Sequence, residues 1–210
     1  MRIGILGTGM MASALGRGWA VAGHEVAIAG RSSAKAQELA GRLGHGTRAV
    51  TPRQAVSDRD AVLLAVSWQG VEDMLRSAGA GDGAMRGTAL IDPTNAVEHG
   101  VGVVLTGPGE AMADRIARLS PGANVVKAFN MFPADQWAEQ SDVTVAMCGD
   151  DAGALRVVGE LVRDVGGEPF VLGALDRARQ LEEVAGFIIG VAFAGADPNA
   201  AVPRVPAAAG

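Results

Sequence analysis

The sequence predicts an α/β protein with a Rossmann-like, doubly wound and mainly parallel sheet, followed by a small C-terminal helical extension. Short apolar runs alternate with segments of helical periodicity, which is typical of a parallel sheet covered by helices on both faces. A glycine-rich turn follows the first apolar run and opens the first helical segment, as in dinucleotide-binding folds. The length of 210 residues suits one such domain with a small appendage.

The apolar runs do not alternate in polarity, which is typical of strands buried on both faces. They predict strands at residues 3–6, 26–29, 61–66, 89–91, 124–128, 143–147 and 169–172. Helical spacing predicts helices at residues 12–22, 34–43, 70–78, 110–119 and 151–165. Strand and helix therefore alternate through most of the chain.

Residues that start and stop helices support these boundaries. Gly23 follows the first predicted helix, where glycine favours termination. Thr51 and Pro52 fit an N-cap followed by proline at the first helical position. Asp150 and Asp151 precede a later helix and supply the negative charge that a helix N-terminus favours.

Composition excludes several classes of protein. The net charge of -5, without a basic face, argues against nucleic-acid binding. The single cysteine, Cys148, cannot form an internal disulfide, and no signal peptide is visible, so we expect a cytoplasmic protein. No stretch reaches the roughly 18 apolar residues that a membrane-spanning helix needs, so no membrane association is expected.

The turn after the first predicted strand has the G-x-G-x-x-A form of the dinucleotide fingerprint. Gly7 permits the tight turn, Gly9 lets a pyrophosphate approach the backbone, and Ala12 keeps the helix close to the strand. The free N–H groups of the following helix N-terminus then face the phosphates. The sequence therefore predicts dinucleotide binding, the alternative being a glycine turn that only packs helix on strand.

The end of the second predicted strand indicates which dinucleotide is bound. An NAD site has Asp or Glu here to bind the ribose 2′-hydroxyl, but this chain has Gly30 followed by Arg31. A guanidinium, the Ser32 hydroxyl and Lys35 suit a 2′-phosphate, which an acidic residue would repel. The sequence thus favours NADP(H). Ser32 or Ser33 also fits a simple helix N-cap, and both roles are compatible.

Three further strand ends are predicted to line the nicotinamide side of the same cleft, because ligands in such sheets lie beyond the carboxyl ends of the strands. Flat and flexible apolar groups with amides suit a planar ligand there. These candidates are Val66, Ser67, Trp68, Asn95, Asn130, Met131 and Phe132. Trp68 is equally compatible with a packing role, and Asn130 with a bond to a loop backbone.

No catalytic residue or metal site is predicted. His24 and His45 lie in expected turns, and only His99 falls where it could approach the cleft. No metal-ligand spacing and no nucleophile elbow are present, and Cys148 is expected to be buried and inert. Lys127 is the remaining candidate proton donor. A reductase that passes hydride directly between two cofactor-like rings needs none of these groups.

The chain resembles the NADPH-dependent reductases of the deazaflavin coenzyme F420. The resemblance extends from about residue 3 to 195 and rests on "IGILGTGMMASALG", "GHEVAIAGRSSAKA", "AVSWQGV" and "VVKAFNMFPAD". Later in the chain it rests on "CGDD" after a predicted strand and on the segment Arg179-Gln180-Leu181-Glu182. The larger reductases with the same opening motif add a helical domain for which this chain has no room.

The resemblance implies roles for individual residues. Thr8, Arg31 and Lys35 would hold the adenosine 2′-phosphate, and Gly9, Met10 and Met11 would lie along the pyrophosphate and nicotinamide. Ser67 and Trp68 would flank the nicotinamide ribose and ring, while Asn130 and Phe132 would border the deazaflavin. The family also implies a homodimer in which the last helix helps to complete the unit.

The chain departs from the family pattern at three positions. The family often has serine where Gly30 stands, proline where Ser67 stands and histidine where Asn130 stands. The Ser32 hydroxyl offers a substitute for the first of these. The other two lie on the substrate side, so they bear on the identity of the second hydride carrier.

We therefore predict an NADP(H)-binding domain at residues 1–173, a C-terminal helix at 174–196 and a flexible tail at 197–210. The apolar run 184–195 is expected to be a buried helix. The favoured function is hydride transfer between NADP(H) and coenzyme F420. The first alternative is an NADPH-dependent reductase of a small imine or ketone, with Lys127, His99 or Asp92 as proton donor. The second is a non-enzymatic NADPH-binding sensor.

Overall fold

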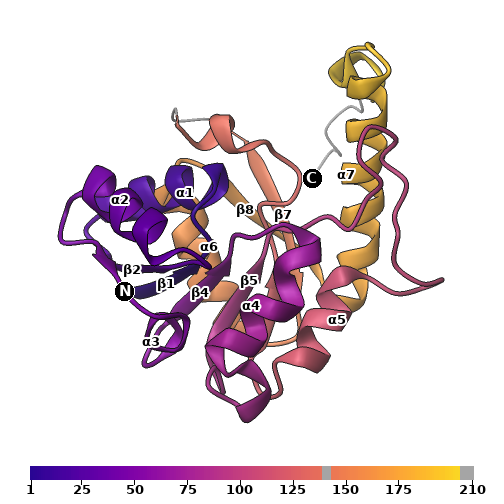
Figure 1. Cartoon of the computed structure of the whole chain (residues 1–210). Helices are drawn as coiled ribbons and strands as arrows, with labels where there is room; N and C mark the ends of the chain where they lie inside the picture. Colours follow the sequence, from indigo (N-terminus) through magenta and orange to yellow (C-terminus); the bar gives the residue numbers. More distant parts are fainter. Residues whose placement is uncertain (139–142, 204–210) are drawn as a thin grey trace.

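The computed structural model describes residues 1–138 and 143–203, which form a three-layer α/β arrangement around one sheet (Figure 1). The sheet has eight strands in the order β3-β2-β1-β4-β5-β6-β7-β8. Their bounds are β1 Arg2–Leu6, β2 Glu25–Ala29, β3 Arg48–Ala49, β4 Ala61–Leu64, β5 Ala89–Asp92, β6 Asn124–Lys127, β7 Thr144–Gly149 and β8 Glu168–Gly173. Each of the seven runs predicted as strands forms one, and the predicted fold class is confirmed.

The sheet differs from the prediction in β3 and in its last two strands. β3 has only two residues, too short to leave an apolar run in the sequence. β7 pairs antiparallel with β6, and β8 then pairs parallel with β7. A parallel crossover usually contains an α-helix that packs on the sheet. The described part of the β6–β7 connection holds only the 3-10 helix Ala134–Ala138, which suits a strand that runs back.

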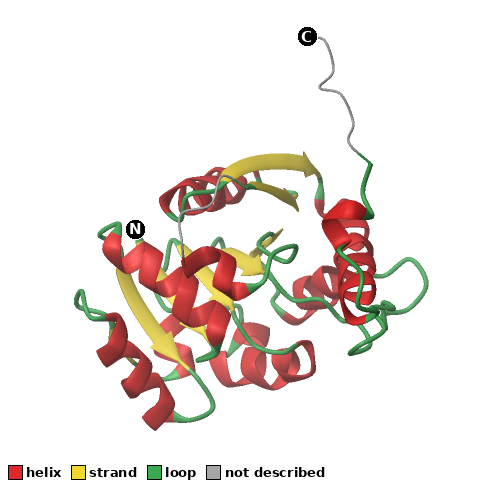
Figure 2. Ribbon diagram, turned by 90° about the horizontal axis from the view of Figure 1, so that it is seen from above, coloured by secondary structure: helices red, strands yellow, loops and turns green. Residues whose placement is uncertain are grey.

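Two groups of helices cover the two faces of the sheet, and Figure 2 shows the layers from above. Side chains alternate along β1, so that Ile3 and Ile5 face one core and Leu6 faces the other. The first core includes α1, α2 and α6, and the second includes α3, α4, α5 and part of α7. The bounds are α1 Met10–Val21, α2 Ser33–Leu43, α3 Pro52–Val56, α4 Val71–Ala78, α5 Met112–Leu119, α6 Ala152–Asp164 and α7 Ala178–Phe193.

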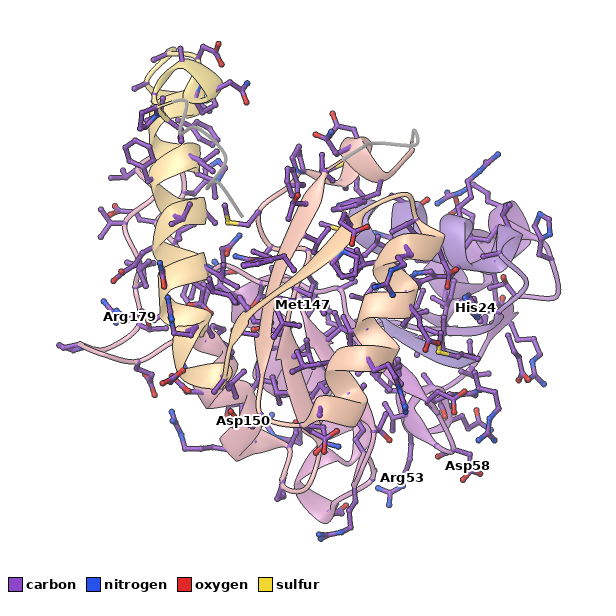
Figure 3. All side chains as sticks on the ribbon, turned by 180° about the vertical axis from the view of Figure 1, so that it is seen from behind. His24, Arg53, Asp58, Met147, Asp150 and Arg179 are labelled. Carbon is purple, nitrogen blue, oxygen red and sulfur yellow. The ribbon has the colours of Figure 1, made fainter. Side chains whose placement is uncertain are left out.

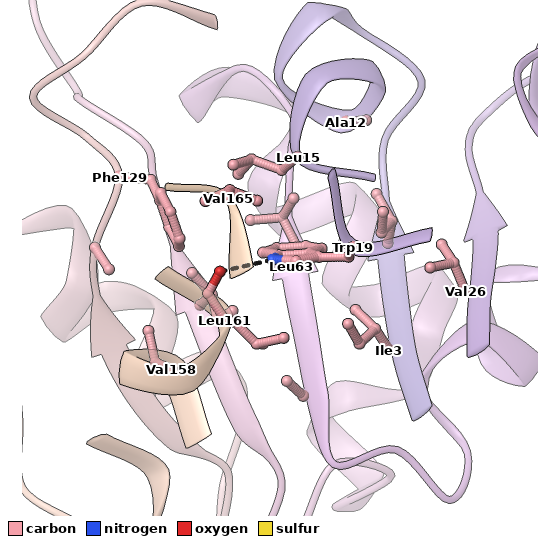
Figure 4. Close-up of a cluster of buried hydrophobic side chains, with 14 of the residues drawn as sticks. Ile3, Ala12, Leu15, Trp19, Val26, Leu63, Phe129, Val158, Leu161 and Val165 are labelled. Atoms are coloured by element: carbon pink, nitrogen blue, oxygen red, sulfur yellow. Dashed lines mark hydrogen bonds between the residues drawn. The ribbon is translucent and has the colours of Figure 1, made fainter. Parts of the chain in front are cut away.

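Most of the helix-start and helix-stop residues act as the sequence indicates, whereas the Asp150 side chain accepts from the Leu175 N–H instead of capping α6. Gly23 has a φ of 89° and follows Ala22, the C-cap residue of α1. Thr51 caps α3 through a capping box with Gln54, and Asp151 caps α6 by accepting from the Ala154 N–H. Trp19 of α1 also donates its indole N–H to the Leu161 carbonyl of α6 at 2.9 Å, which joins two helices across the first core (Figure 4).

The last helix, α7, corrects one expectation. Its first half is buried through Leu181, Glu182 and Ala185, but Phe187 and Phe193 are 53% and 57% exposed. The prediction of a buried helix over residues 184–195 is therefore wrong for the second half, which extends beyond the sheet (Figures 1 and 3). No described helix is long and apolar enough to cross a membrane.

A segment between β5 and α5 packs against the second half of α7. Val97 and Val104 form an antiparallel bridge within it. A Cβ on Gly186 would lie 2.2 Å from the Gly102 carbonyl oxygen, so only glycine permits this approach of the two backbones. The described end of the predicted tail, residues 197–203, contains the short 3-10 helix Pro198–Ala200. The rest of the tail lies outside the described residues, and the domain boundaries stay predictions.

Candidate functional site

The phosphate turn has the geometry that its glycines require. Gly7 has a φ of 136°, and a Cβ there would lie 1.9 Å from the Ala65 carbonyl oxygen. Its N–H donates to the Ala29 carbonyl at 2.7 Å, so the turn is tied to β2. A Cβ on Gly9 would meet nothing within 4 Å, so the space above the N-terminus of α1 is open to a ligand.

A cavity of about 420 Å³ opens beside this turn at the carboxyl ends of β1, β2 and β4. Eight of the predicted cofactor-binding residues line it: Gly7, Thr8, Gly9, Arg31, Ser32, Lys35, Val66 and Ser67. The remaining lining residues are Gly30, Ala65, Gly70 and Met74. The two segments predicted to hold the adenosine 2′-phosphate and the pyrophosphate thus meet at one cavity.

The cavity is electropositive. Arg31 and Lys35 are its charged residues, and neither forms an ion pair within residues 1–138 and 143–203. No Asp or Glu of the described chain lines it. Ser32 caps α2 by accepting from the Lys35 N–H at 3.3 Å while lining the cavity, so its two roles coexist. A cavity with two cations and without a carboxylate suits a phosphate-bearing ligand.

The remaining predicted cofactor residues lie outside this lining. Met10 is 81% exposed at the start of α1, and Met11 is half-buried against the first core. Trp68 is half-buried and packs against the second core, which agrees with the packing role that the sequence also allowed for it. Asn95 follows β5 and is part-buried. The roles of these four residues stay predictions.

Asn95 and Asn130 form a reciprocal amide pair between the ends of β5 and β6. The Asn95 side chain donates to the Asn130 carbonyl at 2.8 Å, and Asn130 Nδ2 donates to Asn95 Oδ1 at 3.0 Å. Asn130 Nδ2 also donates to the Leu181 carbonyl of α7 at 3.1 Å. Asn130 Oδ1 is buried and has no hydrogen-bond partner among the described residues. The pair therefore fixes the turn after β6 and leaves one buried acceptor.

The residue before Asn130 is held in an uncommon conformation. Phe129 has a φ of 65°, a region that a bulky residue rarely occupies. Its buried ring makes edge contacts with Trp19 and Trp137, with centroids 6.1 and 5.2 Å away. Phe132 packs edge-on against Trp137 at 5.7 Å, and Met131 is half-buried. Such backbone strain, of about 1–3 kcal/mol, persists where the surrounding packing over-determines it and is concentrated at functional sites.

A buried ion cluster lies beneath this turn and was not predicted. Lys127 Nζ contacts Asp92 Oδ2 at 2.9 Å and Glu182 Oε1 at 2.6 Å, and all three side chains are inaccessible to solvent. It also donates to the Thr94 carbonyl. Glu182 accepts from the Met112 N–H at the start of α5 at 2.9 Å. The cluster joins β5, β6, α5 and α7.

The cluster shifts the pKa values of Lys127 and Glu182. Burial disfavours the charged form of Lys127, but the carboxylates of Asp92 and Glu182 outweigh it and raise the pKa of Lys127 above its ordinary value. Burial raises the pKa of Glu182, against the attraction of Lys127. A fully enclosed ammonium with a raised pKa does not reach a substrate. The expectation that Lys127 or Asp92 could serve as a proton donor is therefore wrong. Both are buried ions that join elements of the fold.

The other reactive groups also lie away from the cavity. His24 contacts the N-terminal amine and Asp164, and His45 lies in a turn with a φ of 49°. His99 is exposed and stacks edge-on with Phe193 at 5.0 Å. Cys148 is buried as expected, and burial raises its pKa to about 12. Within the described residues, no three His, Cys, Asp or Glu side chains gather as a metal site.

Comparison with known proteins shows that the chain is similar in sequence to NADP-dependent reductases. A family model described as NADP oxidoreductase, coenzyme F420-dependent, matches residues 2–96. The F420-dependent NADP reductase of Methanothermobacter thermautotrophicus is 31% identical over 208 residues, covering 90% of this chain and 88% of that protein. The metalloreductase STEAP3 of Rattus norvegicus is 28% identical over 188 residues, covering 87% of this chain. The chain spans only 36% of that relative.

Solved structures share the fold at lower identity. A candidate F420-dependent NADP reductase from Arthrobacter sp. FB24 superposes with a TM-score of 0.81 at 23% identity, covering 93% of this chain and 96% of that one. An imine reductase from Pseudomonas sp. gives a TM-score of 0.70 at 22% identity, covering 92% of this chain and 63% of that one. At these identities the likeness concerns the fold.

Replacing Lys127 by methionine is expected to lower the free energy of unfolding by about 3 kcal/mol or more. The change leaves Asp92 and Glu182 buried without their cation, and breaking a buried ion pair is strongly destabilising. Urea unfolding followed by tryptophan fluorescence measures the loss. The matched control is Arg42→Met, which removes the exposed pair with Glu38 and should change stability by less than about 1 kcal/mol. Equal losses in both variants would contradict this role for Lys127.

Proposed function

The chain belongs to the family of coenzyme F420-dependent NADP oxidoreductases, and from this premise we propose that it transfers hydride directly between NADP(H) and coenzyme F420. It is an NADP-dependent oxidoreductase by family. The observation that carries the proposal is the electropositive cavity beside the phosphate turn, with Arg31 and Lys35 unpaired among the described residues. The near full-length alignment with an F420-dependent NADP reductase supports the second substrate.

The residues present fit an extended dinucleotide across the carboxyl edge of the sheet. Thr8, Arg31, Ser32 and Lys35 would hold the adenosine 2′-phosphate. The open backbone at Gly9 and the helix N-terminus would hold the pyrophosphate. The nicotinamide side would be bordered by Met10, Met11, Val66, Ser67, Trp68 and Asn95, and the deazaflavin side by Asn130, Met131 and Phe132.

The chain's own contribution is binding, orientation and exclusion of water. When both cofactors are bound, their rings supply the hydride donor and acceptor, and the accompanying proton exchanges with solvent. Holding two rings in a near-attack arrangement lowers the barrier by about 7–11 kcal/mol in well-aligned cases. The turn after β6, fixed by the Asn95–Asn130 pair, is suited to such positioning because its orientation is set before a ligand arrives.

Reduction of a small imine or ketone is the second candidate, supported by the fold shared with an imine reductase. That reaction needs a proton donor next to the acceptor atom. The enclosure of Lys127 and Asp92 counts against both as donors, and His99 packs against Phe193. A non-enzymatic NADPH sensor is the third candidate. It would retain the cation pair of the cavity and bind no second ring.

We also propose a homodimer formed through the second half of α7, in a reducing cytoplasm. Phe187, Phe193, Val101 and Val103 are each more than half exposed. They gather where the segment between β5 and α5 packs on α7, and a groove between the two is lined by Val101, Val103, Phe187 and Val191. A contiguous apolar surface of this kind is typical of an interface. Because the family resemblance implies a homodimer, we propose a second copy of this chain as the partner that covers this surface.

Mixing the protein with NADPH and oxidised F420 is expected to bleach the deazaflavin absorbance at an enzymatic rate. The reason is that the two rings alone supply the hydride donor and acceptor. The deazaflavin absorbance is followed with NADPH and with NADH, and in a separate assay with a cyclic imine in place of F420 the NADPH absorbance is followed instead. Bleaching with F420 supports the first candidate. Turnover of the imine alone, or tight NADPH binding without any turnover, would replace it by the second or third.

Replacing Arg31 by alanine is expected to weaken NADPH binding about 10- to 100-fold and NADH binding less than about 3-fold, because only NADPH carries the 2′-phosphate. Dissociation constants from calorimetry measure both. Arg42→Ala is the matched control, since it removes a cation from α2 outside the cavity lining. Equal weakening of NADPH and NADH by Arg31→Ala would refute the phosphate assignment.

Replacing Phe187 by aspartate is expected to convert a dimer into a folded monomer, because a charge would be buried in the apolar interface. Sedimentation velocity measures the mass. Phe170→Asp is the matched control, since Phe170 is also 53% exposed but lies on the edge strand β8. A wild-type monomer at micromolar concentration would remove the dimer proposal. Dissociation by Phe170→Asp instead would move the interface to β8.

A further inference from the structure

The segment 127–130, which leads from β6 into the following turn, is attached to α7 at both of its ends. At its start, Lys127 Nζ contacts Glu182 Oε1 at 2.6 Å. At its end, Asn130 Nδ2 donates to the Leu181 carbonyl at 3.1 Å. Leu181 and Glu182 are neighbours in α7, so the same turn of this helix holds both ends of the segment. The segment therefore cannot shift against α7 without breaking one of these contacts.

Glu182 is itself held in place from a third element. Its side chain is inaccessible to solvent, and its carboxylate oxygens accept from the Met112 N–H at 3.0 and 2.9 Å. The Ala113 N–H also donates to Oε1 at 3.3 Å, so the carboxylate contacts the start of α5, where negative charge is favoured. A buried charge with these partners has little freedom to move. Glu182 thus transmits the position of α7 to Lys127.

These contacts belong to the ring end of the site and not to its phosphate end. The cavity lining comes from the turns after β1, β2 and β4 and from α2 and α4, and within the described chain it includes no residue of the segment 127–130 or of α7. Met131 and Phe132 directly follow the segment and are half-buried. A change at Glu182 is therefore expected to affect the two ends of the site differently.

We propose that Glu182 is a positioning residue for the second substrate, because it fixes the segment 127–130 through Lys127. The segment in turn sets where Met131 and Phe132 lie. The proposal rests on the proposed function, in which these two side chains border the second ring. Glu182 is enclosed, so it acts through the turn and not by contact with a substrate. Reaction of the second substrate then depends on a residue of the C-terminal helix, whereas binding of NADP(H) does not.

Replacing Glu182 by glutamine tests this role, because it keeps the size of the side chain and removes its charge. Lys127 retains its contact with Asp92, so one cation and one carboxylate remain buried together. At saturating NADPH, kcat/KM for F420 should fall about 10- to 100-fold, as expected for a small misplacement of a reacting ring. The dissociation constant of NADPH from calorimetry should stay within about threefold of the wild type. Hydrogen exchange followed by mass spectrometry should become faster in residues 128–132 and stay unchanged in residues 7–12.

The neighbouring residue offers a matched control. Glu183 pairs with Arg179 at 2.8 Å and is more exposed, so Glu183→Gln should leave the reaction, NADPH binding and hydrogen exchange as in the wild type. Glu182→Asp keeps the charge and shortens the side chain by a methylene. It should move the same quantities in the same direction, and it replaces Glu182→Gln if that variant does not fold.

Several outcomes would overturn the proposal. Wild-type kcat/KM for F420 in Glu182→Gln would do so, as would unchanged hydrogen exchange in residues 128–132. An equal loss of NADPH affinity would also do so, because it would indicate a general loss of structure. A wild-type protein that does not react with F420 would instead refute the proposed function. The exchange measurement needs no substrate, so it would then still decide whether Glu182 fixes the turn.

Discussion

The buried contacts of Lys127 with Asp92 and Glu182 connect the central sheet to the last helix, α7. One cation from β6 meets carboxylates from β5 and α7, and N–H groups at the start of α5 satisfy the second carboxylate. An unpaired buried charge is costly, so the arrangement forms only when all four elements are in place. α7 is therefore fixed to the sheet by charge as well as by apolar burial.

The two ends of the candidate site depend on different physical constraints. At the phosphate end the geometry is local: Gly7 turns the chain, Gly9 leaves the backbone open, and Thr8 packs against Gly30. At the ring end it is non-local, because the position of Asn130 depends on a carbonyl of α7, which the ion cluster in turn holds. The cavity proposed for the dinucleotide is thus formed by the first βαβ unit and the end of β4, whereas the turn after β6 depends on contacts with the C-terminal helix.

The same division between local and non-local geometry determines what could be predicted from the sequence. Seven of the eight strands, the phosphate turn and the Arg31–Lys35 segment are local patterns, and periodicity and residue type alone predict them. The reversal of β7 was not predicted, because continuous apolar runs carry no sign of strand direction. The exposure of Phe187 depends on where α7 extends relative to the sheet. Glu182 was part of a noted segment, but its contact with Lys127 joins residues 55 positions apart, beyond any local pattern.

The turn after β6 indicates what kind of catalysis the chain can supply. The left-handed conformation of Phe129 is unfavourable by about 1–3 kcal/mol, and burial of its ring between Trp19 and Trp137 offsets that energy. The reciprocal amides then hold Asn130 with its Oδ1 buried and unsatisfied by the described residues. An N–H donor of a bound ring is a group of the right chemistry for that acceptor. A turn fixed in this way can orient a neighbouring group but transfers no proton, which is consistent with the proposed hydride transfer between two bound cofactors.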